Sequence, residues 1–273
     1  SEILDPDEIN IFVNEKHKHL ISKNNLQKLD KVFCEPYSRN TTPPICLAAL
    51  NSDPEDILLI FPSDHFIKNH SNFKKNISQM VKFAQKDYIC LFGVKPTEPN
   101  VGYGYIKKGK KINPYASTIE SFEEKPKQFK AQKFFKSNKY LWNSGIFGFK
   151  AKVILDEMRF HDFEMIKKCE ELIKTQKNNK NFLHFNENIF SKLKNESIDY
   201  SIMEKTKKSI LLNLNCSWSD MGTWESIYNQ MPKDKNKNVI QGNISTLDSN
   251  NSFIYSKGRK FIGVQGLKDI SLV

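Results

Sequence analysis

The stretch DILLIFPSDHF, residues 56–66, decides the fold that this sequence predicts. Residues 57–60 form an unbroken apolar run of strand length, which is typical of a strand buried on both faces of a parallel sheet. The chain then turns at a proline and presents Ser63, Asp64 and His65 at the carboxyl end of the strand, the edge where open α/β sheets bind ligands. A carboxylate there can hold Mg²⁺ against phosphate oxygens, although Asp64 could equally cap the next helix.

Apolar runs and helical patterns alternate on both sides of this stretch. Strands are expected at residues 9–13, 31–34, 57–61 and 88–94, and helices at 14–26, after Thr42 and at 71–86. Thr42 is the expected N-cap of its helix, because Pro43 follows in the first turn. The alternation predicts a doubly wound parallel sheet.

The second half of the chain continues this domain and then changes character. A glycine-bearing turn at 101–104 runs into a strand, and the later elements are strands at 119–124 and 210–214 and helices at 127–137, 152–175, 186–195 and 223–230. Residues 1–231 are therefore expected to form one α/β domain, followed by a polar linker. Short β-rich pieces over 239–273 predict a meander, a roll or the start of a β-helix. Because the chain stops in an apolar strand, we expect this module to be cut short.

The composition is that of a folded cytoplasmic protein. Hydrophobic residues make up only 38% of the 273 residues, but the 20 phenylalanines compensate because aromatic rings bury large areas. The five cysteines are odd in number and lack a CxxC motif, which indicates reduced core residues of a cytosolic protein. No apolar run reaches membrane-spanning length and the N-terminus lacks a signal-peptide pattern, so no membrane partner is expected.

The net charge of +11 arises from 42 Lys and Arg against 31 Asp and Glu. A nucleic-acid partner is one interpretation of such a balance. The lysines are scattered, however, the densest run at 107–111 falls in an expected hairpin, and aromatic residues are not interleaved with them. We therefore expect no nucleic acid, because diffuse positive charge also suits small polyanionic substrates.

Six short motifs stand in one order along nearly the whole chain. They are EP at 35–36 with RNT at 39–41, PSDH at 62–65, FEEKP at 122–126, WNSG at 142–145, SIDY at 197–200 with MEK at 203–205, and WSDMG at 218–222. Together they resemble the bacterial mannose-1-phosphate guanylyltransferases. The resemblance implies a Rossmann-like nucleotidyltransferase fold, a mixed sheet flanked by helices with a short C-terminal β-rich extension, roll or β-helix-like. It also implies that mannose 1-phosphate attacks GTP to give GDP-mannose and pyrophosphate, for GDP-sugar and surface polysaccharide biosynthesis.

The resemblance assigns a catalytic role to two distant carboxylates and one lysine. Asp64 and Asp220 would hold one Mg²⁺ that bridges the nucleotide and sugar phosphates, with Lys125 on the phosphate of the sugar. Such transfers depend on positioning and charge neutralisation more than on a protein base, because the attacking phosphate oxygen is already anionic. The alternative for Asp220 is a turn residue beside Gly222.

The resemblance also assigns the sugar contacts. Glu124 would bind sugar hydroxyls, Asn143 offers them an amide, Gly104 would let the backbone approach the sugar, and Ser63 belongs to the same substrate-binding set. The alternatives are a surface charge pair for Glu124 and Lys125 and a plain turn for Gly104.

Two further groups complete the implied site. Glu35, Pro36, Arg39 and Asn40 lie in the stretch that resembles the base-recognition loop of the family, where Arg39 and Asn40 could instead only structure the loop. His65 and Trp142 are expected to be structural, and Asp199 and Glu204 to be supporting groups or ordinary helix residues. These two remain open at this point.

One departure from the family pattern is evident before Gly93, the first glycine of the chain. The family begins with a strand and a Gly-rich loop followed by Arg, which cradles the phosphates of the nucleotide through backbone N–H groups, and no GxGxR pattern occurs here. A degenerate gene, a fragment, or completion by another chain would each explain this. We expect little or no transferase activity from the chain alone, and no isomerase cupin is recognised.

Several alternatives stay open in the sequence. The fold could serve another hexose phosphate and another nucleotide, or the chain could be a catalytically inactive scaffold. A homo-oligomer is allowed by the sequence but not indicated by it.

Overall fold

The computed structural model describes residues 4–21 and 23–273, which form two compact units. The first unit contains the chain up to Phe61 together with Asn69–Cys216, and the second contains Pro62–Lys68 together with Ser217–Val273. The boundary therefore falls before the helix that was expected to end the first domain at residue 231, and that helix belongs to the second unit. No helix among the described residues combines the length and apolarity that crossing a membrane requires.

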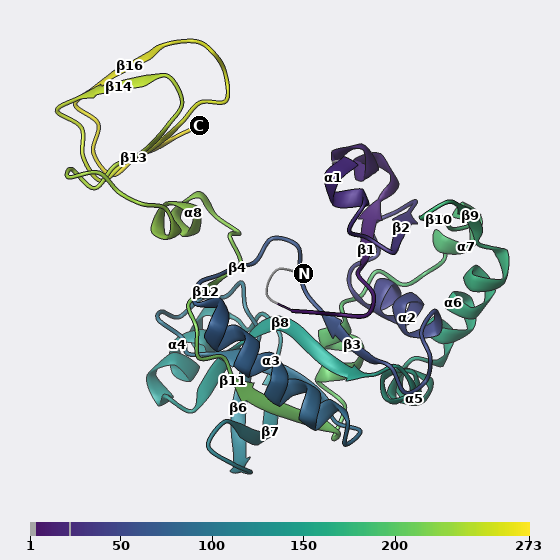
Figure 1. Ribbon diagram of the computed structural model, residues 1–273. Helices are drawn as coiled ribbons and strands as arrows, with labels where there is room; N and C mark the ends of the chain where they lie inside the picture. The colour runs from purple at the N-terminus through teal and green to yellow at the C-terminus, as the bar shows by residue number, and fades with distance from the viewer. Residues whose placement is uncertain (1–3, 22) are drawn as a thin grey trace. The chain divides into compact units, whose positions relative to one another are not determined.

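The first unit is built on a six-stranded mixed sheet in the order β3-β8-β5-β11-β7-β6 (Figure 1). Its strands are β3 (Ile57–Ile60), β5 (Ile89–Val94), β6 (Tyr105–Lys111), β7 (Ala116–Glu123), β8 (Tyr140–Lys150) and β11 (Ser209–Asn213). Only β5 and β11 pair in parallel; β3, β5 and β6 all pair antiparallel with the long β8.

The expectation of a parallel sheet around residues 57–60 was wrong. β3 lies at one end of the strand order, pairs antiparallel with residues 147–150 of β8, and is only half-buried. The physical reason is that β8, which follows β3 by some eighty residues of sequence, inserts between β3 and β5. Local hydrophobicity shows that a segment is a strand but not which strand will lie beside it.

A second, four-stranded sheet in the first unit has the order β1-β2-β10-β9. Its strands are β1 (Asn10–Asn14), β2 (Lys31–Glu35), β10 (Phe182–His184) and β9 (Lys177–Asn179). β1, β2 and β10 are parallel, so their carboxyl ends meet at one edge. The 3₁₀ helix η1 (Glu15–Leu20) follows β1 directly, and α1 (Lys23–Leu26) comes next.

Helices cover both sheets of the first unit. They are α2 (Thr42–Leu50), α3 (His70–Ala84), α4 (Gln128–Ser137), α5 (Ala151–His161), α6 (Phe163–Thr175), α7 (Glu187–Phe190) and the π-helical turn η2 (Asp199–Met203). α3 packs on β5, β8 and β11, while α2, α5 and α6 pack on one another. The helix expected over 152–175 is thus two helices, because Asp162 breaks it and caps α6 through its side chain.

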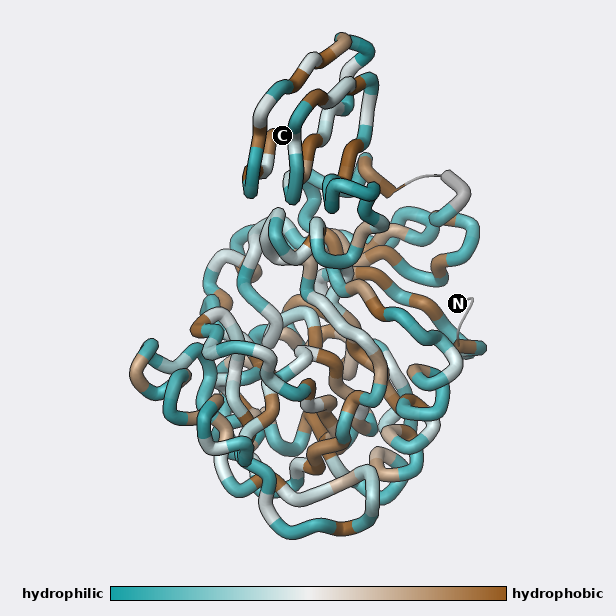
Figure 2. The backbone as a smooth tube through the Cα atoms, turned by 90° about the vertical axis from the view of Figure 1, so that its left-hand side faces the viewer, coloured by the Kyte–Doolittle hydropathy of each residue, from teal (hydrophilic) through white to brown (hydrophobic). Residues whose placement is uncertain are grey.

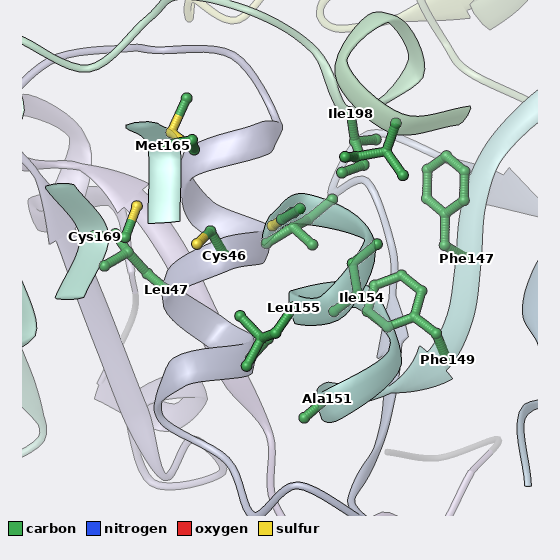
Figure 3. Close-up of a cluster of buried hydrophobic side chains, with 14 of the residues drawn as sticks. Cys46, Leu47, Phe147, Phe149, Ala151, Ile154, Leu155, Met165, Cys169 and Ile198 are labelled. Carbon is green, nitrogen blue, oxygen red and sulfur yellow. The ribbon is translucent and has the colours of Figure 1, made fainter. Parts of the chain in front are cut away.

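The main core fills the space between these helices and the sheets (Figure 3). Cys46 and Leu47 of α2 lie near Cys169 of α6, and Ile154 of α5 lies beside Phe149 of β8. All five cysteines are free, and four are buried, as the expectation of reduced core cysteines required. In Figure 2 the hydrophobic stretches of this unit run through its middle, with hydrophilic loops outside.

Helix starts differ by a residue or more from expectation. Thr42 is the first residue of α2 and not its N-cap, and its hydroxyl lies 2.8 Å from Ser201 Oγ. Thr41 precedes the helix and accepts a hydrogen bond from the Ile198 amide instead. The helix expected over 14–26 is replaced by η1 and α1, and Ser22 between them lies outside the described residues.

The second unit combines a small strand pair, one helix and a parallel β-coil. Its elements are β4 (Phe66–Ile67), β12 (Trp218–Ser219), α8 (Trp224–Gln230), β13 (Val239–Gln241), β14 (Ile244–Leu247), β15 (Phe253–Tyr255), β16 (Ile262–Gln265) and β17 (Ser271–Leu272). β13, β15 and β17 stack in parallel, as do β14 and β16, so successive rungs lie on one another (Figure 2). Of the alternatives for residues 239–273, the β-helix-like one describes this coil.

Candidate functional site

Asp64 and Asp220 stand at the same end of one strand pair in the second unit. β4 and β12 pair antiparallel, with Phe66 opposite Ser219. Asp220 follows Ser219 directly and Asp64 stands two residues before Phe66, so both carboxylates leave the same end of this strand pair. Their negative charges both act on the ring of His65. Two residues that are 156 positions apart are thus brought to one place by the pairing of two very short strands.

His65 links the two sides of this strand pair through contacts with Trp218. Its Nδ1 accepts a hydrogen bond from Trp218 Nε1 at 3.1 Å, and the two rings meet edge to face. Burial lowers the pKa of the His65 imidazole, against the opposing effect of the two aspartates. This agrees with the structural role expected for His65.

The alternative roles of the two aspartates come out differently. Asp64 does not cap α3, because the N-cap is Asn69, whose side chain accepts from the Asn72 amide. Asp220 does take part in a turn, since its Oδ1 accepts from the Gly222 amide at 3.1 Å. Ser63 and Asp64 are both exposed.

In the first unit, Gly104 just before β6, Glu124 just after β7 and Asn143 within β8 lie close together. The Asn143 amide donates to the Gly104 carbonyl at 2.8 Å, which places the two residues on neighbouring strands. A Cβ on Gly104 would lie 2.4 Å from Glu124 Oε2 and 3.3 Å from Asn143 Cβ. The missing side chain of Gly104 is therefore what makes room for the carboxyl group of Glu124.

Glu124 is a buried carboxyl with an incomplete set of partners. Its side chain is only 9% exposed, and Oε2 is buried without a hydrogen-bond partner. Burial raises the pKa of Glu124 to about 7, and the neighbouring Asp199 charge adds to the rise. Because an unpaired buried polar atom costs folding free energy, Oε2 is suited to accept a partner from a ligand.

Lys125 stands beside Glu124 on a constrained backbone. Its Nζ lies 3.7 Å from Glu124 Oε1, and its side chain is 60% exposed. The φ angle of Lys125 is +45°, a left-handed conformation that is uncommon for a residue with a side chain. Glu204 accepts a hydrogen bond from the Glu124 amide at 2.9 Å and Tyr200 donates to the Glu124 carbonyl, so two residues fix this turn.

Asn143 is oriented by a carboxylate and by a bulge. Its Nδ2 donates to Asp199 Oδ1 at 2.8 Å, and its Oδ1 accepts from the Gly145 amide at 3.1 Å. The pairing of β8 with β5 shifts register at this point, and Gly145 has a φ of +70°, which favours glycine. One Asn143 N–H therefore stays available to donate toward a ligand hydroxyl.

Asp199, like Glu204, was left undecided by the sequence. It lies in η2 and is half-buried, and burial raises the pKa of its carboxyl while the hydrogen bond from Asn143 opposes the rise. No spacing signal could have linked residues 143 and 199, since they meet only through the tertiary fold. Trp142, expected in the core, is 5% exposed and packs there with Tyr105 and Ala131.

The loop after β2 is anchored through Arg39 and Asn40, and two buried polar atoms of this stretch, Glu35 Oε1 and Arg39 Nε, have no hydrogen-bond partner. Arg39 Nη2 donates to the Ser191 carbonyl, and Asn40, with a φ of +64°, accepts from the Thr41 amide at 3.0 Å. Half-buried Pro36 follows Glu35, whose Oε1 is buried without a hydrogen-bond partner. Burial raises the pKa of Glu35 to about 7.

Comparison with known proteins identifies the class to which this fold belongs. The model of the nucleotidyl transferase family matches residues 5–237, which is most of the chain. The chain therefore belongs to the nucleotidyl transferase family, as the sequence motifs implied.

Individual relatives narrow the comparison. The mannose-1-phosphate guanylyltransferase of Escherichia coli is 34% identical over 277 residues, which cover 96% of this chain and 59% of that protein. The chain thus spans a little more than half the length of such curated relatives. A solved structure described as mannose-6-phosphate isomerase from Helicobacter pylori is 35% identical, with a TM-score of 0.72 over 78% of this chain and 85% of that one.

A more distant structure supports the fold alone. The chain described as mannose-1-phosphate geranyltransferase from Thermus thermophilus is 24% identical, and its TM-score is 0.79 over 96% of this chain and 75% of that one. The mixed-sheet nucleotidyltransferase fold expected from the motifs is therefore confirmed.

Proposed function

We propose that this chain carries the sugar-phosphate and metal sites of a mannose-1-phosphate guanylyltransferase, which transfers GMP from GTP to mannose 1-phosphate and releases pyrophosphate. The observation that supports this most directly is the buried, unpartnered Oε2 of Glu124 beside Gly104 and Asn143. The similarity to the guanylyltransferase of Escherichia coli over 96% of the chain supports the choice of sugar and nucleotide. The product is an activated sugar for surface polysaccharide synthesis.

The first unit is suited to hold the sugar. Glu124 Oε2 would accept a hydrogen bond from one hydroxyl, and the remaining Asn143 N–H would donate to another. Asn143 Oδ1 already accepts from the Gly145 amide, so the second N–H of Nδ2 is the group that we assign to the sugar. Lys125, largely exposed next to Glu124, would neutralise the phosphate of the sugar.

The second unit supplies hard oxygen ligands for the metal. Asp64 and Asp220 fit Mg²⁺, which binds through one or two carboxylates and completes its shell with water and phosphate oxygens. When bound, the ion would neutralise phosphate charge during the transfer. The contribution of this chain is to hold the two carboxylates at one end of the β4–β12 pair, with His65 and Trp218 fixing that end.

The loop of Glu35 is the candidate base site. Guanine presents N–H donors, and the unpartnered Glu35 Oε1 is an acceptor suited to them. Arg39 Nη2 donates to the Ser191 carbonyl, but the buried Arg39 Nε has no hydrogen-bond partner, so Arg39 could donate to the base or to a phosphate. Asn40 accepts from the Thr41 amide, and we assign it to loop structure.

Calorimetry with the folded chain tests this proposal. GDP-mannose should bind in the presence of Mg²⁺ and more weakly with excess chelator. UDP-glucose and dTDP-glucose should each bind at least about tenfold more weakly than GDP-mannose, a difference of about 1.4 kcal/mol in binding free energy. Glu124→Gln should weaken GDP-mannose binding while leaving the thermal unfolding cooperative.

The alternatives make opposite predictions in the same experiment. Equal or tighter binding of UDP-glucose would assign the fold to another hexose phosphate. No binding of any nucleotide sugar to a cooperatively folded chain would favour a scaffold and contradict the proposal.

A further inference from the structure

Three metal-binding side chains meet at the carboxyl edge of the four-stranded sheet of the first unit. Cys34 near the end of β2 pairs in register with His184 at the end of β10, and both strands run parallel. Glu15 follows the last residue of β1, the other parallel neighbour of β2. Three strands that run side by side therefore deliver a thiol, an imidazole and a carboxylate to one point.

The distances among these groups are those of a potential ligand set. One ligand atom of each residue lies within 4.8 Å of the other two, and His184 Nδ1 is 3.1 Å from Glu15 Oε2. Zinc bonds of about 2.0–2.3 Å require ligand atoms about 3.3–3.7 Å apart in a tetrahedron. Small side-chain rotations would therefore be enough to close the set around an ion.

The surroundings favour a metal over a simple ion pair. Glu15 binds the Lys18 ammonium with Oε1 and faces His184 with Oε2, so one oxygen is held by an outer partner while the other faces the site. The Cys34 thiol is 1% exposed, and Glu15 and His184 have side chains about one third exposed, which leaves a side open to solvent. A fourth ligand could thus be water.

We propose that Glu15, Cys34 and His184 form a binding site for Zn²⁺ or a similar late first-row divalent ion, with one coordination position open. A thiolate and an imidazole select such ions and exclude Mg²⁺, which prefers oxygen ligands. On binding, the ion displaces the thiol proton to solvent, and Cys34 coordinates as thiolate without any change of oxidation state. Since Cys34 directly precedes Glu35, the ion would also restrain the start of the loop that follows β2.

The burial of Cys34 should make the metal affinity of this site depend on pH. Without metal, burial and the nearby Glu15 charge raise the pKa of the Cys34 thiol to about 11. The Lys18 ammonium opposes that rise, and His184 is the other side chain of the cluster that faces the thiol. Metal affinity should therefore increase with pH, because the ion competes with the thiol proton.

Cobalt spectroscopy on the tag-free chain tests the site directly. One equivalent of Co²⁺ should produce a thiolate-to-cobalt absorption in the near ultraviolet, which Zn²⁺ abolishes and a large excess of Mg²⁺ leaves in place. Cys34→Ser should eliminate this absorption. Glu15→Gln and His184→Asn should each weaken Co²⁺ binding by more than about tenfold, because loss of even an outer partner of a metal ligand costs about that much.

Matched control variants use metal-binding side chains outside the cluster. His17 and His19 are exposed on η1, the short helix that begins with Glu15, and Cys216 is a half-buried free thiol. The double variant His17→Ala/His19→Ala and the variant Cys216→Ser should keep the full absorption and affinity. Circular dichroism melts of every variant verify folding.

Several results would overturn the proposal. These are no near-ultraviolet absorption in the wild-type chain, absorption that survives Cys34→Ser, or displacement of Co²⁺ by Mg²⁺. Loss of binding in the His17/His19 variant to the same degree as in His184→Asn would also contradict it. Since none of these measurements uses a nucleotide or a sugar, failure here leaves the proposed transferase function untouched.

Discussion

Replacing Gly104 with alanine is the sharpest single test of the sugar site. The added Cβ would meet Glu124 Oε2 at 2.4 Å, a separation that real Cβ atoms essentially never show. The carboxyl group must therefore move away from the position it holds beside Asn143. Gly104 is not among the residues with positive φ, so alanine adds no backbone strain, and Glu124 Oε2 is the nearest atom it meets, ahead of Asn143 Cβ and Phe122 at 3.3 Å.

The expected magnitude follows from the hydrogen bond that would be lost. A hydrogen bond to a charged group contributes about 1.5–3 kcal/mol, which corresponds to a factor of about 10–150 in affinity. Gly104→Ala should therefore raise the Kd for GDP-mannose within this range. The Kd for GDP, which lacks the sugar, should stay within about twofold, a difference below about 0.5 kcal/mol.

A second glycine provides a control with the same kind of clash. A Cβ on Gly109, in the hairpin of β6 and β7, would lie 2.4 Å from Thr118 Oγ1. Gly109→Ala should therefore perturb stability at least as much as Gly104→Ala but leave both Kd values unchanged. Calorimetric titration of both variants with GDP-mannose and GDP decides the matter. Equal Kd values for GDP-mannose in Gly104→Ala and wild type would refute the assignment of Glu124 to the sugar.

Three further predictions concern the charges of the two sites. Glu124→Gln should stabilise the chain increasingly as pH rises from about 4.5 to about 8. The reason is that the pKa of Glu124 is raised to about 7 in the folded state, where the carboxylate form is disfavoured. Urea titration at several pH values should show the free energy of unfolding of the variant, relative to wild type, change by up to about 3 kcal/mol. Asp64→Asn and Asp220→Asn should each remove the Mg²⁺ enhancement of GDP-mannose binding in calorimetry, and the double variant should be no worse than either single one, because both residues would serve one ion. Asn143→Asp should place a second carboxylate against Asp199 Oδ1, which now lies 2.8 Å from the Asn143 Nδ2 donor. The free energy of unfolding should fall by about 1–3 kcal/mol. Unchanged thermal stability would contradict the orientation described here.

The elements of the fold were largely predictable, but their pairing was not. The apolar runs at 57–61 and 88–94 and the amphipathic pattern at 71–86 correspond to β3, β5 and α3 within a few residues. The position of β8 between β3 and β5 was missed, because it depends on contacts between segments far apart in the chain. Hydrophobic periodicity carries the local part of the information only.

In the candidate site, too, the sequence predicted single residues but not the contacts between distant ones. Glu124 and Asn143 were singled out because their motifs resemble a known family, and the structure brings both next to Gly104. The bond from Asn143 to Asp199 and the meeting of Cys34 with His184 had no signal in the spacing of residues. Both arise from strands or turns that approach only when the sheets have formed. The roles given to these residues stay predictions until binding is measured.

Two glutamates in the first unit each have a buried oxygen that is suited to accept a hydrogen bond from a ligand. Glu35 and Glu124 each stand at the carboxyl end of a strand, each has one buried oxygen without a partner, and burial raises the pKa of each to about 7. Neither arrangement favours folding, since a buried polar atom without a partner is destabilising. A ligand that donates hydrogen bonds at both places would remove both unfavourable contributions, as the hydroxyls of a sugar and the N–H groups of guanine can. The stabilisation of the chain by GDP-mannose should accordingly exceed the sum of the effects of mannose 1-phosphate and GDP given separately at matched concentrations, since linking two weak ligands makes the second contact intramolecular.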